Sequence, residues 1–194
     1  MKHIGSCAGR LPMAATYLVA VALWAQDVTL PTPQYDEVFY RYDPVAQKLI
    51  DLERQVATIE SKPKAMGFSG YKVSHFLRGS HSTVRFRQSD PLEFVVSLPQ
   101  RTDPHVVQFF SLREAGHRRE LVEAQSNRPS PLGVGTAKDM RDKSTISYEI
   151  RKYGESAYRL IPSKPLPPGE YALSFPTSEV AFAFGIDGEG GKIP

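Results

Sequence analysis

The residues of this chain that could bind a transition metal are five histidines and one cysteine, Cys7. No histidine is followed by a second at a short helical spacing, and none has the paired cysteines of a zinc site. His75 and His81 could meet across a bend and bind a metal with Asp90, but their spacing matches no known ligand pattern. The sequence therefore favours two exposed loop histidines over a metal site, and it predicts no cofactor.

The tripeptide Ser80-His81-Ser82 places hydroxyl groups beside an imidazole, as a nucleophile and its base would require. Adjacent residues on a strand point to opposite faces, however, and the chain has no Gly-x-Ser-x-Gly elbow that would expose a serine. A hydrolase is therefore not predicted. An enzyme that uses His75, His81 and nearby acids at an unfamiliar site is kept as an alternative.

Glycine-rich segments could in principle cradle a phosphate, and two occur here: Gly133-Val134-Gly135-Thr136 and Gly188-Glu189-Gly190-Gly191. Neither follows a buried strand and opens a helix, as a phosphate-binding loop does. Asp187 and Glu189 offer too few clustered oxygen ligands for a calcium loop. Both segments are interpreted as turns.

Three aromatic residues in one short run, Phe39, Tyr40 and Tyr42, are the best candidates for contact with a partner. Their side chains alternate in direction along a strand, so at least one ring is expected on the surface if the other face packs in a core. Exposed rings can stack on sugars or anchor a partner protein, whereas buried rings are ordinary core material of β domains. An envelope protein or a glycan is the partner that this interpretation predicts.

Residues 1–25 have the three-part layout of a secretory signal peptide. Lys2 and Arg10 precede an apolar run from Leu11 to Trp24, and cleavage is expected after Ala25. The run has about 14 residues, fewer than the roughly 20 that a membrane-spanning helix needs. A retained anchor is therefore the less favoured alternative, and no membrane span is expected after cleavage.

Cleavage there would remove Cys7, so the mature chain could form no disulfide. Export without disulfides favours a bacterial periplasm or the extracellular space. It would also remove Lys2 and Arg10, which leaves 22 basic residues against 21 acidic ones in place of 24 against 21. This balance, with no long block of like charge, predicts no nucleic-acid partner.

Alternating apolar residues predict a mainly β fold. Residues 38–42 and 48–53 flank Asp43-Pro44, and this arrangement favours a hairpin, because proline presets φ in a turn. A helix over residues 44–59 is the alternative. Glycines and a proline between Ser61 and Ser82 predict short, poorly aligned strands there.

Further strands are expected in the middle of the chain at residues 83–87, 92–98, 106–112 and 119–124, the last two joined as a hairpin. Residues 125–143 form a long loop with few apolar residues, which is typical of a disordered segment or of a partner-binding loop. Three or four strands follow between residues 146 and 187. In the last of them the small residues Ala181, Ala183 and Gly185 lie opposite a large apolar stripe, so a neighbour approaches closely there or that face is solvated.

The segment from Leu166 through Pro168 and Gly169 to Tyr171 places a rigid corner before an alternating strand. It resembles the tyrosine corner of fibronectin type III and other immunoglobulin-like domains, in which the tyrosine hydroxyl bonds to the backbone upstream. The resemblance covers about 30 residues and implies a topology rather than an activity.

The order of features along the chain also resembles a group of exported bacterial β-rich proteins that have no assigned activity. The residues that carry this resemblance are 38–40, 65–70, 152–156, the Pro-Gly-Glu-Tyr corner and 184–187. It implies export and a β-rich fold, and it transfers no catalytic residue.

Together these observations predict an antiparallel two-sheet immunoglobulin-like sandwich with an N-terminal hairpin extension. The expected organisation is a signal peptide (1–25), an N-terminal leader and hairpin region packing on the main domain (26–82), a β-sandwich domain (83–187) and a flexible tail (188–194). The predicted function is a noncatalytic binding or assembly module of the bacterial envelope. A carbohydrate-binding module and an enzyme with an unrecognised site are the alternatives.

Overall fold

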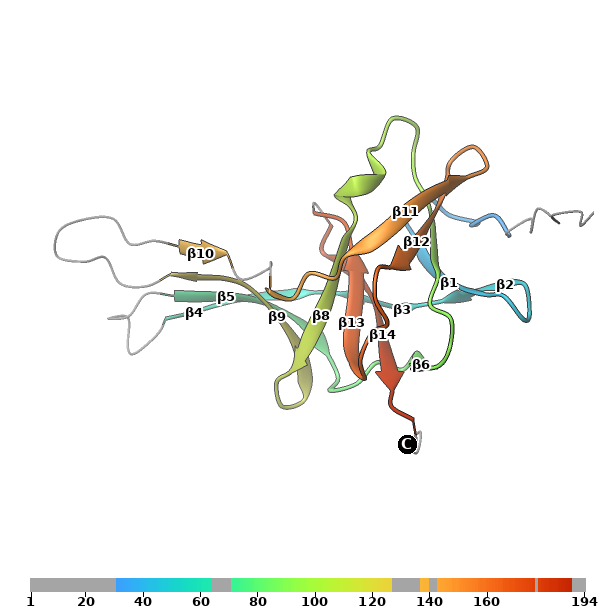
Figure 1. Ribbon diagram of the computed structural model, residues 1–194. Helices are drawn as coiled ribbons and strands as arrows, with labels where there is room; N and C mark the ends of the chain where they lie inside the picture. Colours follow the sequence, from blue (N-terminus) through green and yellow to red (C-terminus); the bar gives the residue numbers. More distant parts are fainter. Residues whose placement is uncertain (1–30, 64–70, 127–136, 140–142, 177, 190–194) are drawn as a thin grey trace, which may run out of the picture.

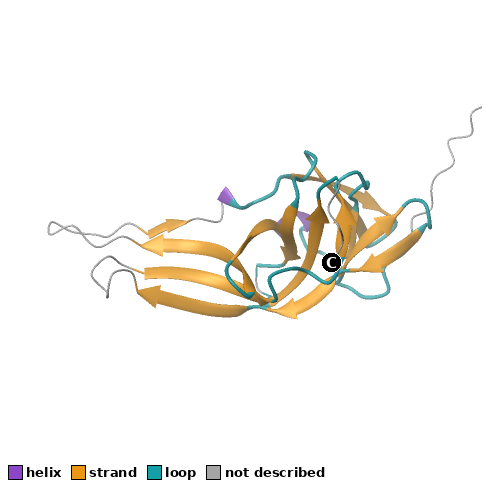
Figure 2. Ribbon diagram, turned by 90° about the horizontal axis from the view of Figure 1, so that it is seen from below, coloured by secondary structure: helices purple, strands orange, loops and turns teal. Residues whose placement is uncertain are grey.

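The structure is a computed structural model that describes residues 31–63, 71–126, 137–139, 143–176 and 178–189. The fold is mainly β, with two sheets packed face to face (Figures 1 and 2), as the sequence predicts. A single-turn 3-10 helix, η2 (Pro104–Val106), begins after Asp103, whose carboxylate accepts a hydrogen bond from the His105 N–H. In the described part of the chain no helix has the length and hydropathy needed to cross a membrane.

The first sheet has five strands in the order β11-β12-β7-β1-β2, and every pairing in it is antiparallel. Its strands are β1 (Phe39–Asp43), β2 (Lys48–Asp51), β7 (Phe94–Ser97), β11 (Tyr148–Tyr153) and β12 (Ala157–Pro162). The pairing of β1 with β2 confirms the hairpin predicted around Asp43-Pro44 over the alternative helix. Asp43 Oδ1 accepts hydrogen bonds from the N–H groups of Val45 and Ala46, which fixes the turn.

The second sheet has the order β3-β14-β13-β8-β9-β5-β4, with β10 paired to β9 and the short β6 paired in parallel to β14. Its strands are β3 (Glu53–Val56), β4 (Thr58–Pro63), β5 (Tyr71–Arg78), β6 (Arg85–Arg87), β8 (Gln108–Glu114), β9 (Arg118–Ser126), β10 (Ala137–Asp139), β13 (Gly169–Ser174) and β14 (Val180–Asp187).

This second sheet curls into a half-barrel because its two outermost strands follow each other in the chain. β3 pairs with β14, β4 pairs with β5, and only Ala57 separates β3 from β4. The side chain of Gln55 joins β3 to the end of β5, where no strand pairing does. Its Oε1 accepts from the Arg78 N–H at 2.8 Å, and its Nε2 donates to the Arg78 carbonyl at 3.2 Å.

Four strands of the half-barrel extend past the sandwich as an arm, made of β4, β5, β9 and β10 (Figure 1). The arm begins where β8 and β9 separate, since they pair only at Arg113 and Glu114 while β9 pairs with β5 over its length. The prediction of short, poorly aligned strands between Ser61 and Ser82 is wrong for β5, an eight-residue strand with one register shift. The strand pairs with β4 on one side and β9 on the other, and the glycines at 67 and 70 lie outside the described residues.

The main core lies between the two sheets and is built from aromatic rings. Phe94 of the first sheet packs on Phe184 and Phe109 of the second, with ring centroids 4.8 and 5.7 Å apart. Tyr171 stacks on Phe184 at 5.5 Å. All four side chains are buried, so their burial supplies a large share of the hydrophobic stabilisation.

Residues 39–63 and 71–78 supply strands to both sheets, through the pairing of β1 with β7, β3 with β14, and β5 with β9. The part of the chain predicted to be a leader and hairpin region therefore shares its hydrogen-bonded ladders with the strands after residue 83. The predicted signal peptide (1–25) and most of the tail lie outside the described residues. Of the predicted long loop, residues 125–126 belong to β9 and residues 137–139 form β10.

Candidate functional site

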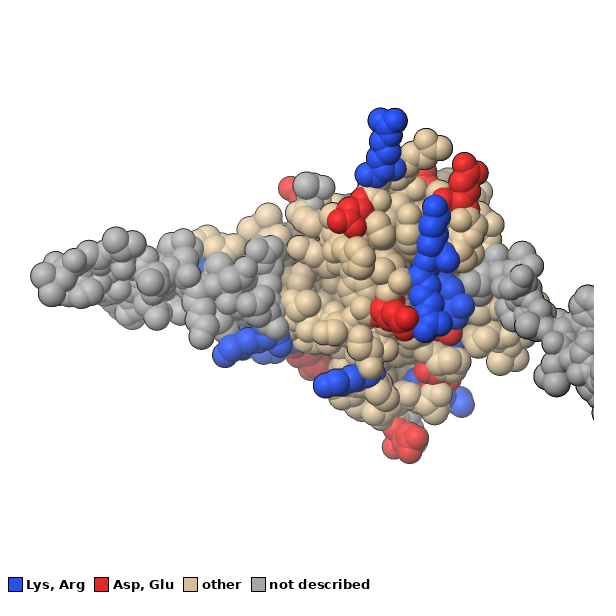
Figure 3. Space-filling view, turned by 45° about the horizontal axis from the view of Figure 1, so that its top comes forward, with Lys and Arg blue, Asp and Glu red and all other residues tan. Residues whose placement is uncertain are grey.

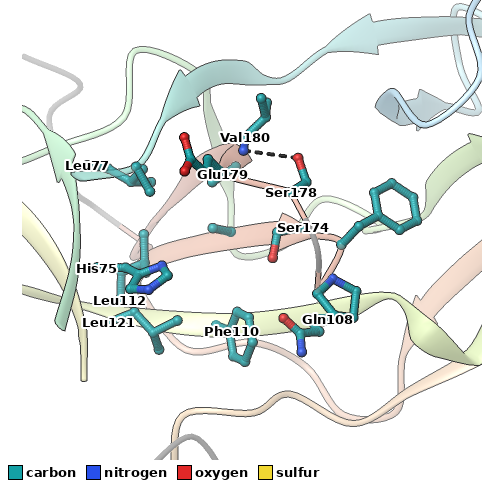
Figure 4. A pocket seen from close by; sticks show the side chains of 15 residues that line it. His75, Leu77, Gln108, Phe110, Leu112, Leu121, Ser174, Ser178, Glu179 and Val180 are labelled. Atoms are coloured by element: carbon teal, nitrogen blue, oxygen red, sulfur yellow. Dashed lines mark hydrogen bonds between the residues drawn. The ribbon is translucent and has the colours of Figure 1, made fainter. Parts of the chain in front are cut away.

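The candidate site is a cavity inside the half-barrel, on the side of the second sheet that faces away from the sandwich core (Figure 4). Strand alternation directs the small side chains of β13 and β14, Ala172 and Ala181, into it. Its remaining apolar wall comes from β5, β8 and β9: Leu77, Phe110, Leu112 and Leu121. The cavity has a volume of about 60 Å³ over the positions that the centre of a water molecule can occupy. The cavity is therefore small, with room for a few waters or a small group.

The rim of the cavity is polar. Gln108 and Ser174 are cross-strand neighbours on β8 and β13, and His75 on β5 completes the side nearest the arm. Ser178 and Glu179 belong to the turn before β14 and are exposed. Ser178 Oγ accepts a hydrogen bond from the Val180 N–H at 3.0 Å, so this hydroxyl caps the turn (Figure 4).

A network of buried ion pairs closes the opposite end of the half-barrel. The side chain of Arg119 is fully buried, and its guanidinium donates to both carboxylate oxygens of Glu53 at 3.1 and 3.2 Å. It also donates to the carbonyls of Arg78 and Gly79, at 2.8 and 3.2 Å. A buried guanidinium requires this number of partners, because its desolvation is costly otherwise.

The network continues through Glu170, which is only 3 % exposed. Its carboxylate lies 3.6 Å from Arg119, accepts from Arg85 Nη1 at 2.6 Å and accepts from the Ser82 N–H at 2.8 Å. Arg85 in turn donates from Nε and Nη2 to Asp187 at 2.8 and 2.6 Å. The loop between β5 and β6 is thereby fastened across the end of the half-barrel.

The ionisation of these groups follows from their partners. Burial opposes the charge of Glu53, but hydrogen bonds from Ser82 and Arg119 outweigh it and hold its pKa below the usual value. Asp187 and Glu170 raise the pKa of Arg85. Glu53 and Arg85 are therefore both charged at neutral pH, and the network is ionic.

A second ionic cluster covers the outer face of the arm. Glu120 pairs with Lys72 and Arg113, and these contacts overcome its burial and lower its pKa to about 2. Arg118 lies over the ring of Phe76 at 3.7 Å and forms an ion pair with Glu60. On the face of the body shown in Figure 3, basic and acidic side chains are interspersed rather than gathered by sign.

The three aromatic residues predicted as partner contacts are all buried: Phe39 is 0 %, Tyr40 7 % and Tyr42 3 % exposed. The expectation that at least one ring is exposed is wrong because both faces of β1 are covered. Phe39 packs on Phe175, the residue that follows β13, with centroids 5.0 Å apart. On the other face Tyr42 packs in a small cluster with Val95.

The histidines predicted as alternative site residues are not gathered into one site. His75 lines the cavity, whereas His81 lies at the closed end, with Nδ1 3.5 Å from carboxylate oxygens of both Glu114 and Glu170. Asp90 caps a turn by accepting from the Arg87 N–H at 3.0 Å. Within the described residues, no three His, Cys, Asp or Glu side chains lie together in an arrangement that could hold a metal ion.

The corner residues lie where β13 begins. Tyr171 donates a hydrogen bond from its hydroxyl to the Pro167 carbonyl at 2.7 Å, which is the bond expected of a tyrosine corner. Leu166 is buried in the main core, and Gly169 has a φ of 158° beside the Tyr171 ring. Pro168 lies next to Gly188, at 3.3 Å from the position of an added Cβ there.

Sequence reasoning missed the cavity, because its walls come from five strands that are far apart in the chain. The one available signal was the stripe of Ala181, Ala183 and Gly185 opposite large apolar residues. In the structure Ala181 lines the cavity, and the guanidinium of Arg85 lies close to the backbone of Gly185. A neighbour therefore does approach this face of β14 closely, as one of the two sequence interpretations expected.

Comparisons of the chain with protein-family models, with curated proteins and with solved structures find no match.

Proposed function

We propose that this chain is an exported, noncatalytic binding module of the bacterial envelope and that the cavity inside the half-barrel is its binding site. The proposal rests above all on one observation: an apolar cavity with a polar rim opens on a rigid sheet of otherwise well-packed side chains. The layout of residues 1–25 supports the exported location.

The two alanines support a binding role for the cavity. Ala172 and Ala181 lie on adjacent paired strands, and larger side chains there would fill the space. Protein interiors are close-packed, and unfilled space costs stability because its lining loses contacts. Retaining small residues in the wall is thus expected where another molecule occupies the space.

The polar groups of the rim suit positioning rather than catalysis. Gln108 and Ser174 offer hydrogen-bond donors and acceptors, while Ser178 is engaged in capping its turn. The buried ionic groups Arg119 and Glu170 are paired to each other and to neighbours at the closed end. A binding module is the function that these roles support best.

The carbohydrate-binding alternative requires aromatic rings exposed on a sheet face. Of the aromatic rings whose exposure the structure describes, only that of Tyr35 is exposed, at 60 %. Tyr35 precedes β1 and therefore does not lie on a sheet face. Sugar stacking usually needs a platform of such rings. We therefore propose a protein as the partner.

The test is in-cell crosslinking of the tagged chain in its native host, followed by mass spectrometry of the captured molecules and of the chain's own N-terminus. Ala172→Leu fills the cavity, and Ala46→Leu adds the same atoms at an exposed turn as a matched control. We expect the unmodified chain and Ala46→Leu to capture the same envelope protein and Ala172→Leu to lose it.

Thermal unfolding of each variant separates loss of binding from loss of fold, and Ala181→Val provides a milder filling of the same space. Equal capture by a folded Ala172→Leu variant would remove the cavity as the site. Capture of glycan alone would favour the carbohydrate alternative, and a mature N-terminus far from Gln26 would contradict export by the predicted signal.

A further inference from the structure

We infer that the ligand of this cavity is the end of an unbranched alkyl chain that carries a primary ammonium group, as in a lysine side chain of the partner protein. This inference rests on the proposed function, since it names the chemistry that the cavity selects.

The size and lining of the cavity favour a small apolar group such as the end of an alkyl chain. The walls are formed largely by leucine, phenylalanine and alanine side chains, and the space between them is small, at about 60 Å³. Leu77, Leu121, Ala172 and Ala181 all line the cavity and offer apolar contacts to the methylene groups of such a chain. Bulky aromatic or branched groups would have to displace those walls.

The charge at the rim favours a cation. Among the described lining residues, Glu179 carries the one carboxylate. Neither lysine nor arginine is among the described lining residues. A carboxylate ligand would therefore be repelled by Glu179, whereas an ammonium group would be attracted to it.

Neutral acceptors at the rim can take the remaining ammonium protons. An ammonium group has three donors and no acceptor, so it requires oxygens on several sides. The Ser174 hydroxyl and the Gln108 amide oxygen lie on paired strands at the rim and offer two of them. The apolar stem and the charged head of a lysine then each meet a matching surface.

The two arginines of the network at the closed end are paired with carboxylates other than Glu179. Arg85 is held by Asp187 and Glu170, and Arg119 is held by Glu53, all at the closed end. The carboxylate of Glu179 lies instead beside the exposed turn before β14. Its charge is thus available to a ligand at the mouth of the cavity.

The test uses three probes of equal chain length, namely n-butylammonium, n-butanol and butyrate, in separate titrations of the full chain at constant ionic strength. Methyl resonances of Leu77, Leu121, Ala172 and Ala181 report binding by NMR. We expect saturable shifts with n-butylammonium and binding of n-butanol that is about threefold to fivefold weaker, as the loss of one exposed ion pair implies. Butyrate should bind more weakly than n-butanol, because Glu179 repels its carboxylate.

Glu179→Gln should abolish the preference for n-butylammonium over n-butanol and keep the binding of n-butanol. Glu155→Gln, an exposed carboxylate in the turn between β11 and β12, is the matched control and should leave the preference unchanged. Ala172→Leu should abolish binding of all three probes.

Equal binding of n-butanol and n-butylammonium, or a preference that survives Glu179→Gln, would overturn the inference while leaving an apolar binding cavity in place. If none of the three probes binds, the inference is also overturned. The capture experiment above would then decide separately whether the cavity binds a partner at all. Failure of the ligand chemistry and failure of the proposed function are thus distinguishable.

Discussion

The guanidinium of Arg85 lies directly over the Cα of Gly185, in the space that a side chain would occupy. A Cβ added to Gly185 would be 2.7 Å from Arg85 Cζ and closer still to Nη1, with Glu170 Oε1 at 3.0 Å. The absence of a side chain on β14 at this point therefore allows Arg85 to reach both Glu170 and Asp187. A single glycine thus positions the ion pairs that close the half-barrel.

Gly185→Ala should destabilise the fold by about 2 kcal/mol or more, since it forces Arg85 out of a packed, charge-paired position. Urea unfolding measures this change. Gly185→Ala combined with Arg85→Ala should cost less than the sum of the two single changes, because the clash disappears with the guanidinium. Additive costs would show that Gly185 and Arg85 do not share this space.

Arg119→Met should be among the most destabilising substitutions in the chain, at about 3 kcal/mol or more, because it leaves the carboxylate of Glu53 without its cation and removes one of the two cations beside buried Glu170. The neighbouring residue supplies the control. Arg118 lies on the other face of β9 and its side chain is 35 % exposed, so Arg118→Met should cost about 1 kcal/mol or less. Similar losses of unfolding free energy for the two variants would contradict the buried network.

The alternating strands and the turns of this fold could be predicted from the sequence, because they depend on local patterns. The Asp43-Pro44 hairpin forms where proline and an aspartate side chain fix a turn between two β-rich segments. The stripe of Val180, Phe182, Phe184 and Ile186 does face the other sheet. Both follow from residues within a few positions of each other.

The curl of the second sheet could not be predicted, because it depends on contacts between distant strands. The β8 and β9 residues form a hairpin as expected, yet β9 then leaves β8 and follows β5. Gln55 closes the half-barrel by bonding to Arg78, 23 residues away, through a side chain that resembles any exposed polar residue in sequence. Without that curl, Leu77 and Leu121 would not face Ala172 across a cavity.

The burial of Tyr40 and Tyr42 has the same origin. Alternation places them on the face of β1 opposite Phe39, which in an isolated two-sheet pattern is the solvent face. In the structure Tyr42 forms a small cluster with Val95, and Leu49 of β2 and Tyr153 of β11 pack against that cluster. The neighbours of a strand, and not its own pattern, decide whether its second face is covered.

Tyr171→Phe should lower the free energy of unfolding by about 1 kcal/mol, because it removes the hydrogen bond to the Pro167 carbonyl and keeps the ring stacked on Phe184. Urea unfolding should show a lower midpoint with an unchanged slope. Tyr35→Phe removes the same hydroxyl from a side chain that is 60 % exposed and should change stability by less than about 0.5 kcal/mol. Indistinguishable midpoints would mean that the corner bond does not stabilise the fold.

Glu120 makes the stability of the arm dependent on pH in a defined window. Its pKa is about 2 in the folded chain against 4.5 for an unperturbed glutamate, because hydrogen bonds from Lys72 and Arg113 outweigh its burial. A folded pKa below the unfolded one gives a contribution that is complete above about pH 4.5 and is lost as pH falls toward 2. Glu120→Gln should therefore be less stable than the unmodified chain at pH 7, and the difference should shrink steadily between pH 4.5 and pH 2.

Glu149→Gln is the control. Glu149 and its partner Arg151 are more than half exposed, so solvent screens their ion pair and its loss should change stability little. Chemical unfolding at a series of pH values measures both differences, and a Glu120→Gln difference that stayed constant down to pH 2 would show that this carboxylate is not held by its two cations.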